Sequence, residues 1–349
     1  MRLRHTFGKT TRSAGNRLRC VVAICSLLVV CEPGLTSDAW AQPTPEPQLT
    51  DQKKTEREPS PGMYVPPNEQ HPAIAIPIWR QSNHQAYVSV GTERSFIGAA
   101  MTSASALVVI DYDPKIVQFA AINRALLAAS HNREDYLTLR LLAPAAVWAE
   151  REAEVSVEDA QTLRDEESWT FWKEKVRENT GAWSSAFGNL NKPADAPDAP
   201  FAQTNYLFDD QLFRHLRDLA KSGRIWTRIL DLRDEAAVRT LCEDLHAKGL
   251  KLGIVDTSNV PDESEAGTAT AGQYITWFAK YAGDSVLFLN TERANRHSDT
   301  HWSYYAFTIK AVKAKDAKTI TRWYQKEIAK LQSDSQTRAV IDDPDVVGN

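Results

Sequence analysis

Short apolar runs alternate with segments of helical periodicity through the second half of the sequence. Ile225–Leu232 and Ser285–Asn290 are short and rich in branched or aromatic residues, which is typical of buried strands. Between them, Asp234–Lys248 carries its apolar residues on one helical face, and Gly249 follows where that helix would end. Leu250–Val255 is a further apolar run of strand length. This alternation predicts a parallel sheet with helices on both faces.

The first half of the sequence repeats the same unit. Ala86–Val90 and Ala106–Ile110 read as strands, and Phe96–Ser103 reads as a short helix between them. Asp113 is suited to cap the next helix, which would run to about Ser130. The remaining predicted elements are a helix at Gln273–Ala282, an edge strand at Ser303–Val312 and a final helix at Ala317–Leu331.

Residues 133–222 interrupt this rhythm. The segment combines several tryptophans with many charges, and Trp169, Trp172 and Val176 have the spacing of one helical stripe. We interpret it as a helical insertion whose tryptophans belong to the core. The predicted fold class is therefore α/β: a Rossmann-like, mostly parallel sheet with helices on both faces and a helical insertion.

The N-terminal region has a different character. Residues 1–19 contain six basic and no acidic side chains, Cys20–Cys31 is an apolar run of twelve, and Ala39-Trp40-Ala41 offers small residues before a cleavage point. This predicts a signal peptide at 1–41 and a secreted or periplasmic protein, with an uncleaved membrane anchor as the alternative. Residues 42–73 form a Pro-rich disordered linker, 74–332 the α/β domain and 333–349 a disordered tail.

Removal of the signal changes the charge of the chain. It takes six basic and two acidic residues, which leaves 35 Lys and Arg against 43 Asp and Glu, a net charge near −8. This balance argues against a nucleic-acid partner and against docking on anionic lipid, and no transmembrane segment is expected in the mature chain. Cys242 alone would stay, so no intramolecular disulfide can form.

Polar groups follow each predicted strand, where open parallel sheets bind their ligands. Gly91 permits a tight turn after the first strand. Asp111, about 20 residues further on, is placed to accept hydrogen bonds from ribose hydroxyls. Asp231 and Asp234 follow the third strand, and either of them is also suited to cap the next helix. Ser258 and Asn259 follow the fourth strand, directly after Asp256.

Two stretches carry a resemblance to a known family. YVSVGTERSFIGAAM…ALVVIDYDPKIVQF and LKLGIVDTSNVPD resemble class I S-adenosylmethionine-dependent methyltransferase-like proteins, and in particular an uncharacterised bacterial family with exported members. The resemblance covers about a third of the chain, at 87–123 and 225–307. A more distant similarity is to aminocarboxypropyl transferases of betaine-lipid synthesis. The chain departs from the family in its glycine-rich loop, which is reduced to Gly91 and Gly98.

The resemblance implies roles for these positions. Gly91, Thr92 and Glu93 would border the methionine part of S-adenosylmethionine, and Asp111 would meet its ribose. The adenine would lie near Asp231 or Asp234. The substrate would be faced by three residues of the loop after the fourth strand: Asp256, Ser258 and Asn259.

A second constellation is the polar loop with His297, Asp299 and His301, whose side chains suit Zn²⁺ or Fe²⁺. The sequence thus supports three functions. The first is a transferase that uses S-adenosylmethionine, with Asp256, Asn259 or His301 as candidate bases. The second is a non-catalytic binding or scaffold protein whose partner is a small-molecule ligand or an envelope protein. The third is a metal-dependent hydrolase at the 297–301 loop.

Overall fold

The computed structural model describes residues 75–80, 84–178, 205–260, 267–282, 286–293, 302–308, 315–332 and 339–342. All of them lie in the second of two units into which the chain divides, Leu49–Asn349. The signal and the linker that the sequence predicts, and the loop that carries His297, Asp299 and His301, lie outside the described residues.

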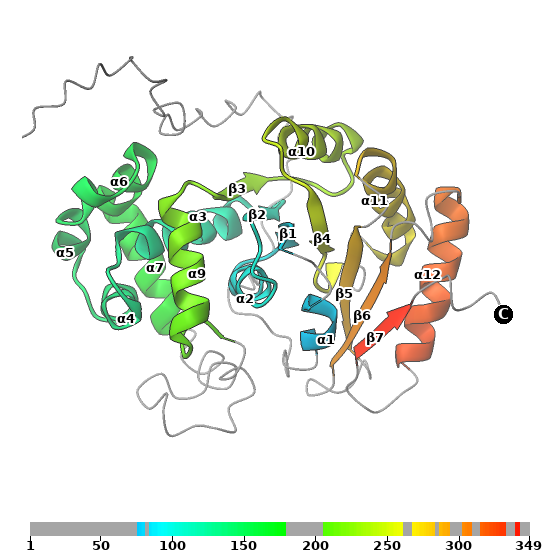
Figure 1. Cartoon of the computed structure of the whole chain (residues 1–349), viewed down its shortest axis with the longest axis horizontal. Helices are drawn as coiled ribbons and strands as arrows, with labels where there is room; N and C mark the ends of the chain where they lie inside the picture. Colours follow the sequence, from blue (N-terminus) through cyan, green and yellow to red (C-terminus); the bar gives the residue numbers. More distant parts are fainter. Residues whose placement is uncertain are drawn as a thin grey trace, which may run out of the picture. The chain divides into compact units, whose positions relative to one another are not determined.

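Seven strands form one sheet in the order β3-β2-β1-β4-β5-β6-β7 (Figure 1). Their bounds are β1 Ala86–Val90, β2 Ala106–Asp111, β3 Ile225–Ile229, β4 Leu252–Asp256, β5 Leu287–Arg293, β6 Trp302–Thr308 and β7 Ala339–Asp342. The pairs among β1 to β5 are parallel, β6 runs antiparallel to β5, and β7 runs parallel to β6. The order of the first five strands is that of a doubly wound Rossmann-like sheet, so the predicted fold class is confirmed.

Helices connect the strands. The bounds of those around the sheet are α1 Ile76–Trp79, α2 Glu93–Met101, α3 Pro114–Ala129, α10 Glu235–Ala247, α11 Gly267–Tyr281 and α12 Ala317–Gln332. The insertion between β2 and β3 contributes α4 Arg133–Leu141, α5 Ala145–Ala149, the short 3₁₀ helix η3 Glu152–Glu154, α6 Val157–Arg164, α7 Glu166–Glu178 and α9 Asp210–Lys221. As predicted, Asp113 caps α3 by accepting the Lys115 N–H at 2.8 Å.

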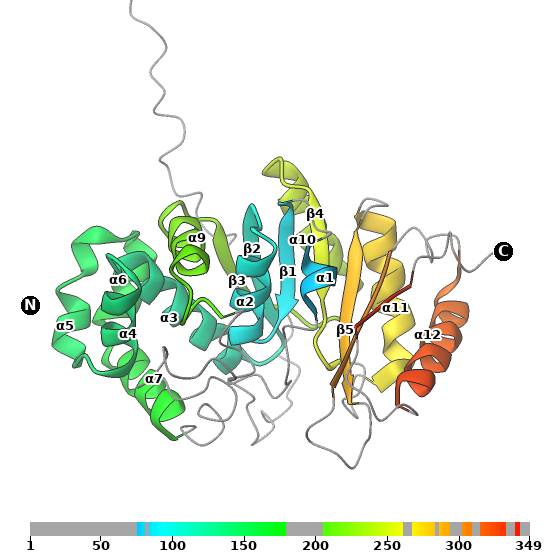
Figure 2. The ribbon, with the colours of Figure 1, turned by 60° about the horizontal axis from the view of Figure 1, so that its bottom comes forward.

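The two faces of the sheet bury separate hydrophobic cores. Alternate residues of one strand divide between them, because Tyr87 belongs to one core and Val88 to the other. The first core includes side chains of α1, α2, α3 and the insertion, and the second includes side chains of α10, α11 and α12. Figure 2 shows α2 and α9 on one side of the sheet and α10 on the other. Helices therefore cover both faces.

Two tryptophans of the insertion, Trp148 and Trp172, are core residues, as the sequence predicts. Trp172 of α7 stacks on Phe119 of α3 with ring centroids 4.3 Å apart, and Trp148 meets Trp172 edge to face. Both tryptophans are fully buried, and their indole N–H groups donate to the carbonyls of Leu139 and Arg140. The insertion is thus packed onto the domain through aromatic contacts on α3.

The structure corrects the C-terminal part of the prediction. The strand at Trp302–Thr308 is not at the edge, because β7 pairs with its outer side. That seventh strand, Ala339–Asp342, falls inside the segment expected to be a disordered tail. Its four residues give too short a pattern to distinguish a strand from a polar tail. Two helices, α2 and α11, also begin earlier than their apolar periodicity indicates.

Two further findings bear on the sequence analysis. Cys242 is buried in the stripe of α10 that faces the second core, as predicted. Burial raises the pKa of its thiol to about 12, which keeps the group protonated and unreactive at neutral pH. Among the described helices, none has the length and apolar character needed to span a bilayer.

Candidate functional site at the carboxyl edge of the sheet

The carboxyl ends of β3, β2, β1 and β4 lie side by side along one edge of the sheet. These strands are adjacent and parallel, and Val90 is in register with Ile110, Asp111 with Ile229, and Ser89 with Asp256. The loops that begin at residues 91, 111, 231 and 256 therefore share one rim, as the sequence interpretation requires. The strand order reverses between β1 and β4, which is where a sheet of this type opens a crevice for ligand.

A buried ion pair bridges that switch point. Arg94, in the first turn of α2, donates from Nε to both carboxylate oxygens of Asp256 at 3.1 and 3.0 Å, and from Nη2 to Oδ1 at 3.0 Å. The side chain of Arg94 is 7% exposed and that of Asp256 is 0% exposed. The guanidinium also lies 5.3 Å from the ring centroid of Tyr304 in β6. Arg94 thus joins the helix after β1 to the end of β4.

Asp256 has further donors. Tyr87 donates its hydroxyl to Oδ2 at 2.6 Å, and the N–H of Ser258 donates to Oδ1 at 2.9 Å. Burial, and after it the charge of Asp256, raises the pKa of Tyr87 well above its ordinary value, so the phenol keeps its proton. Both carboxylate oxygens are therefore occupied. This geometry favours a structural role for Asp256 over proton transfer.

Glu93, the residue before Arg94, is also neutralised by buried side chains of the protein. Its two carboxylate oxygens accept from Nη2 of Arg140 at 2.6 Å and from the hydroxyl of Tyr206 at 2.6 Å. The side chains of Glu93 and Arg140 are both 0% exposed. Burial acts to lower the pKa of Arg140, but the charges of Glu93, Tyr136 and Tyr206 and the hydrogen bond to Glu93 together outweigh it, so the pKa is raised. Arg140 and Tyr206 both belong to the insertion, so the insertion supplies the partners of Glu93.

The same network explains a buried amide on α3. Asn123 donates from Nδ2 to the hydroxyl of Tyr206 at 3.1 Å and accepts from the hydroxyl of Tyr136. Tyr136 in turn accepts from Nη1 of Arg140 at 2.8 Å. Burial raises the pKa of Tyr136 to about 12, so this phenol is a donor at neutral pH. Asn123 is thus satisfied in the core, as its place on a buried helical face predicts.

Asp111, at the end of β2, is in a different environment. It is partly exposed, and its Oδ1 accepts a local bond from the N–H of Asp113 at 2.9 Å. Burial raises the pKa of its carboxyl to about 7, against the backbone N–H groups of Asp113, Tyr112 and Gly91, which lower it. No arginine or lysine pairs with Asp111 among the described residues. Its carboxylate is therefore a rim acid with capacity to accept hydrogen bonds from a ligand.

Gly91 and Tyr112 border Asp111. Gly91 has φ of +89°, which favours glycine, and a Cβ placed on it would meet no atom within 4 Å. The space beside its Cα is therefore open. Tyr112 is 54% exposed, which is unusual for a large aromatic side chain. An open backbone turn, a carboxylate and an exposed ring thus meet at the ends of β1 and β2.

The other predicted residues are placed on the same rim. Asp231 is held by its neighbour Arg233, whose Nε donates to its two oxygens at 2.8 and 3.0 Å. Asp234 is the N-cap of α10 and accepts the Ala236 N–H at 2.8 Å. Thr92 is buried and precedes α2 as its N-cap residue, without a side-chain cap. Of these residues, Asp231 is partly exposed and Asp234 is exposed.

The loop after β4 is built by backbone bonds. The Val260 N–H donates to the Thr257 carbonyl at 3.1 Å, and the Ser258 carbonyl accepts from Thr291 of β5 at 2.9 Å. Ser258 has φ of +51°, a left-handed conformation that its flanking bonds impose. Asn259 is partly exposed beside it. His301 lies outside the described residues, and within the described ranges no three His, Cys, Asp or Glu side chains are arranged to hold a metal ion.

Sequence reasoning missed the residues that close the switch point. In the sequence Arg94 is one more polar residue after the first predicted strand, and Arg140 and Tyr206 lie in the insertion far along the chain. The sequence does contain an indication that Arg94 is buried. Helix α2 continues as FIGAAM, which is apolar on all sides, and a helix of this kind is buried. Charged residues at the start of a buried helix need partners of opposite charge.

Comparison with known proteins gives one family and a distant structural likeness. One protein-family model, described as Domain of unknown function (DUF7790), matches residues 64–339. No curated protein matches the sequence. Two solved structures of the rRNA methyltransferase aviRa from Streptomyces viridochromogenes are similar at a TM-score of 0.32. The first is 16% identical and covers 69% of this chain and 80% of its own. The second is 15% identical and covers 68% and 78%.

Proposed function

The chain belongs to the family described as Domain of unknown function (DUF7790), and we propose that its α/β domain is a non-catalytic binding module for a nucleoside or similar ribose-containing ligand. The observation that carries this proposal is the contrast between two halves of one rim. The carboxylates on the β1–β4 side are each paired with a buried arginine, whereas Asp111 on the β2 side has no such partner among the described residues.

The paired half explains why we favour binding over group transfer. The family resemblance assigns Glu93 to the methionine part of S-adenosylmethionine, where a carboxylate would attract the ammonium group. Glu93 already meets Arg140 and Tyr206 and has no exposed surface. A ligand ammonium would have to displace a buried charged partner, which costs several kcal/mol, on the order of the ~3–5 kcal/mol lost when such a pair is broken. Contact with Glu93 would therefore add little to the binding free energy of the methionine part.

The open half supplies the groups that a ribose and a base require. A carboxylate at the end of the second strand accepts hydrogen bonds from vicinal hydroxyls, and Asp111 occupies this position. Gly91 leaves space beside the turn, and the exposed ring of Tyr112 offers a surface on which a base can stack. These groups bind and orient a ligand but include no reactive side chain.

Calorimetry with adenosine tests the proposal. The titration is run on the full chain at pH 8, where Asp111 is mostly ionised. Replacing Asp111 by Asn removes a charge-assisted bond worth about 1.5–3 kcal/mol, so binding should weaken by about 10- to 100-fold. Asp209→Asn is the matched control, because Asn caps a helix as well as Asp, and this exposed N-cap of α9 belongs to the insertion and not to a loop at the end of a strand. No heat with wild type at millimolar adenosine, or equal affinity in both variants, would contradict the proposal.

An S-adenosylmethionine-dependent transferase is the second candidate. Asn259 favours it, because this residue is partly exposed after β4 and can meet a substrate from the same rim. In that case the methionine part must contribute to affinity, since the transferred group is held next to it. The two candidates therefore differ in how affinity depends on that part of the ligand.

Export is a separate part of the proposal. It rests on the basic start, the apolar run and the Ala39-Trp40-Ala41 sequence. Sequencing the N-terminus of the protein recovered from its host tests it. A first residue of Gln42 in an extracytoplasmic fraction is expected, and a chain that starts at Met1 in the cytosol would contradict it.

A further inference from the structure

The last helix of the domain carries a row of cations. Lys315 precedes α12, and Lys318, Arg322 and Lys326 follow on it at intervals of three or four residues. At 100° per residue these four positions fall within about 80° of rotation, and they span about 16 Å along the axis. All four side chains are exposed. The row lies opposite the buried face, which contains Ile320 and Tyr324.

These cations are distinguished by their alignment on one face of a single helix. Several arginines elsewhere on the surface pair with acids: Arg133–Asp210, Arg151–Asp135, Arg164–Glu152, Arg228–Asp244 and Arg233–Asp231. Other exposed cations, such as Lys221 and Lys251, have no ion pair among the described residues but stand singly. Lys318, Arg322 and Lys326 make no ion pair within the described part of the chain, although the sequence has more acids than bases. A row of exposed cations without ion pairs among the described residues produces a local positive potential on this face of the helix.

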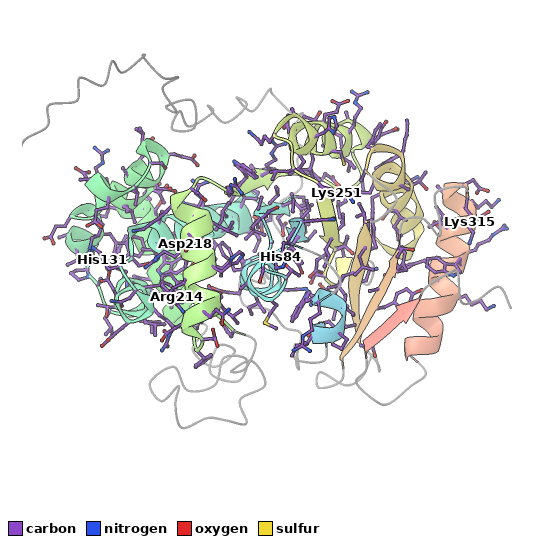
Figure 3. All side chains as sticks on the ribbon, viewed as in Figure 1. His84, His131, Arg214, Asp218, Lys251 and Lys315 are labelled. Atoms are coloured by element: carbon purple, nitrogen blue, oxygen red, sulfur yellow. The ribbon has the colours of Figure 1, made fainter. Side chains whose placement is uncertain are left out.

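Asp316, the acidic residue next to Lys315, does not pair with the row. The carboxylate of Asp316 accepts from the N–H of Thr319 at 2.9 Å and from its hydroxyl at 2.8 Å, so it caps the helix. Figure 3 shows that Lys315 also lies far from Asp218, an acidic residue of α9.

We propose that the row formed by Lys315, Lys318, Arg322 and Lys326 docks the protein on the surface of an anionic lipid bilayer. Four to eight basic residues on one side of an amphipathic helix are typical of contact with anionic headgroups. A straight row on a convex helix can meet a flat surface with all its members at once. The net charge of the chain, which argues against lipid docking, is an average that conceals this local row.

The geometry favours lipid over nucleic acid. Proteins that hold single strands present aromatic side chains on which bases stack. The exposed large apolar side chains among the described residues are Tyr112, Leu142 and Val157, and none lies on α12. The same absence excludes deep insertion of the described part of the helix into the acyl region, so docking would be electrostatic and reversible by salt.

Vesicle co-sedimentation of the full chain tests this surface. The probes are phosphatidylcholine vesicles with and without 30% phosphatidylglycerol, at 0.1 and 1 M salt. Binding is expected with phosphatidylglycerol at low salt only, because the screening length falls from about 10 Å to about 3 Å. At about fivefold per charge, the combined Lys318→Gln, Arg322→Gln and Lys326→Gln variant should lose about 100-fold in partitioning.

Two variants make the result specific. A control replaces Arg214, Lys221 and Lys251 by Gln; these residues are exposed and lie off α12, and two of them are labelled in Figure 3, so partitioning should stay unchanged. Replacing Lys318 and Lys326 by Arg keeps the charge and should keep binding. Equal losses in the row variant and the control, binding that ignores phosphatidylglycerol, or row-dependent binding to homopolymeric RNA but not to vesicles would each overturn the proposal. This test does not involve Asp111, so it is independent of the nucleoside site.

Discussion

Arg94 and Asp256 are separated by 162 positions in the sequence, yet they form one buried ion pair across the reversal of strand order. The pair occupies the place where a doubly wound sheet normally admits its ligand. The ligand site that we propose is displaced toward β2, at Gly91, Asp111 and Tyr112. The proposed binding chemistry follows from that displacement.

Breaking the pair should cost much of the stability. Arg94→Ala leaves the carboxylate of Asp256 buried with the Tyr87 hydroxyl and the Ser258 N–H as its donors, so we expect a loss of about 3–5 kcal/mol. Urea unfolding measures the change. Arg233→Ala is the control, because its pair with Asp231 is partly exposed and should contribute about 1 kcal/mol or less. A loss below 1 kcal/mol for Arg94→Ala would show that Asp256 is not held as described.

Two matched tyrosine substitutions test the contact between the insertion and Glu93. Tyr206→Phe removes the donor to Glu93 and the acceptor of Asn123, and should cost about 1–3 kcal/mol because the groups left behind are buried. Tyr112→Phe removes a hydroxyl from a side chain that is 54% exposed, where water can replace a lost partner, and should change stability by less than about 0.5 kcal/mol. Thermal or urea unfolding compares the two, and similar effects would contradict the assigned network.

The pH dependence of stability should report on Asp111. Its pKa is about 7 in the folded protein, against the ordinary aspartate value of 3.8 that applies to the unfolded chain, so the folded protein holds the proton more strongly. Its contribution to stability is therefore full below about pH 4 and is lost as the pH rises through 7. Asp111→Asn should be neutral at pH 4 and stabilising at pH 8. Unfolding curves at both values measure this, and stabilisation at pH 4 only would reverse the expected sign.

The end of α2 offers a prediction about the backbone. Ser103 has φ of +49° and its N–H donates to Ala100, while the N–H of Ala104 donates to Ala99, which is the Schellman arrangement usually closed by glycine. Ser103→Gly should stabilise the protein by about 1 kcal/mol because it relieves the left-handed strain. Gly223→Ala, at φ of +65° after α9, should have the opposite sign. Unfolding free energies that do not differ in sign would contradict this account.

Local patterns sufficed to predict the scaffold. The strands at Ala86–Val90 and Ala106–Ile110 and the cap at Asp113 follow from apolar runs and cap chemistry over a few residues. Since parallel strands that are adjacent in a sheet end at the same edge, the sequence alone predicts that Gly91, Asp111 and Asp256 lie along one edge, as the strand order confirms.

Long-range partners were not predictable in the same way. Glu93 and Asp256 looked like groups that face a ligand, but their partners Arg140 and Arg94 depend on how the insertion and α2 pack. A carboxylate at a strand end has the same local sequence whether a ligand or an arginine neutralises it. Strand β7 was missed for a related reason, because pairing with β6 orders four residues whose own pattern is weak.

The affinity of the full chain for S-adenosylmethionine relative to adenosine, measured by calorimetry at pH 8, tests the central claim most directly. If Glu93 is already satisfied by Arg140 and Tyr206, the methionine part adds almost nothing, and the two dissociation constants should agree within about threefold. Binding of S-adenosylmethionine that is a hundredfold tighter than that of adenosine would contradict the account and support a transferase.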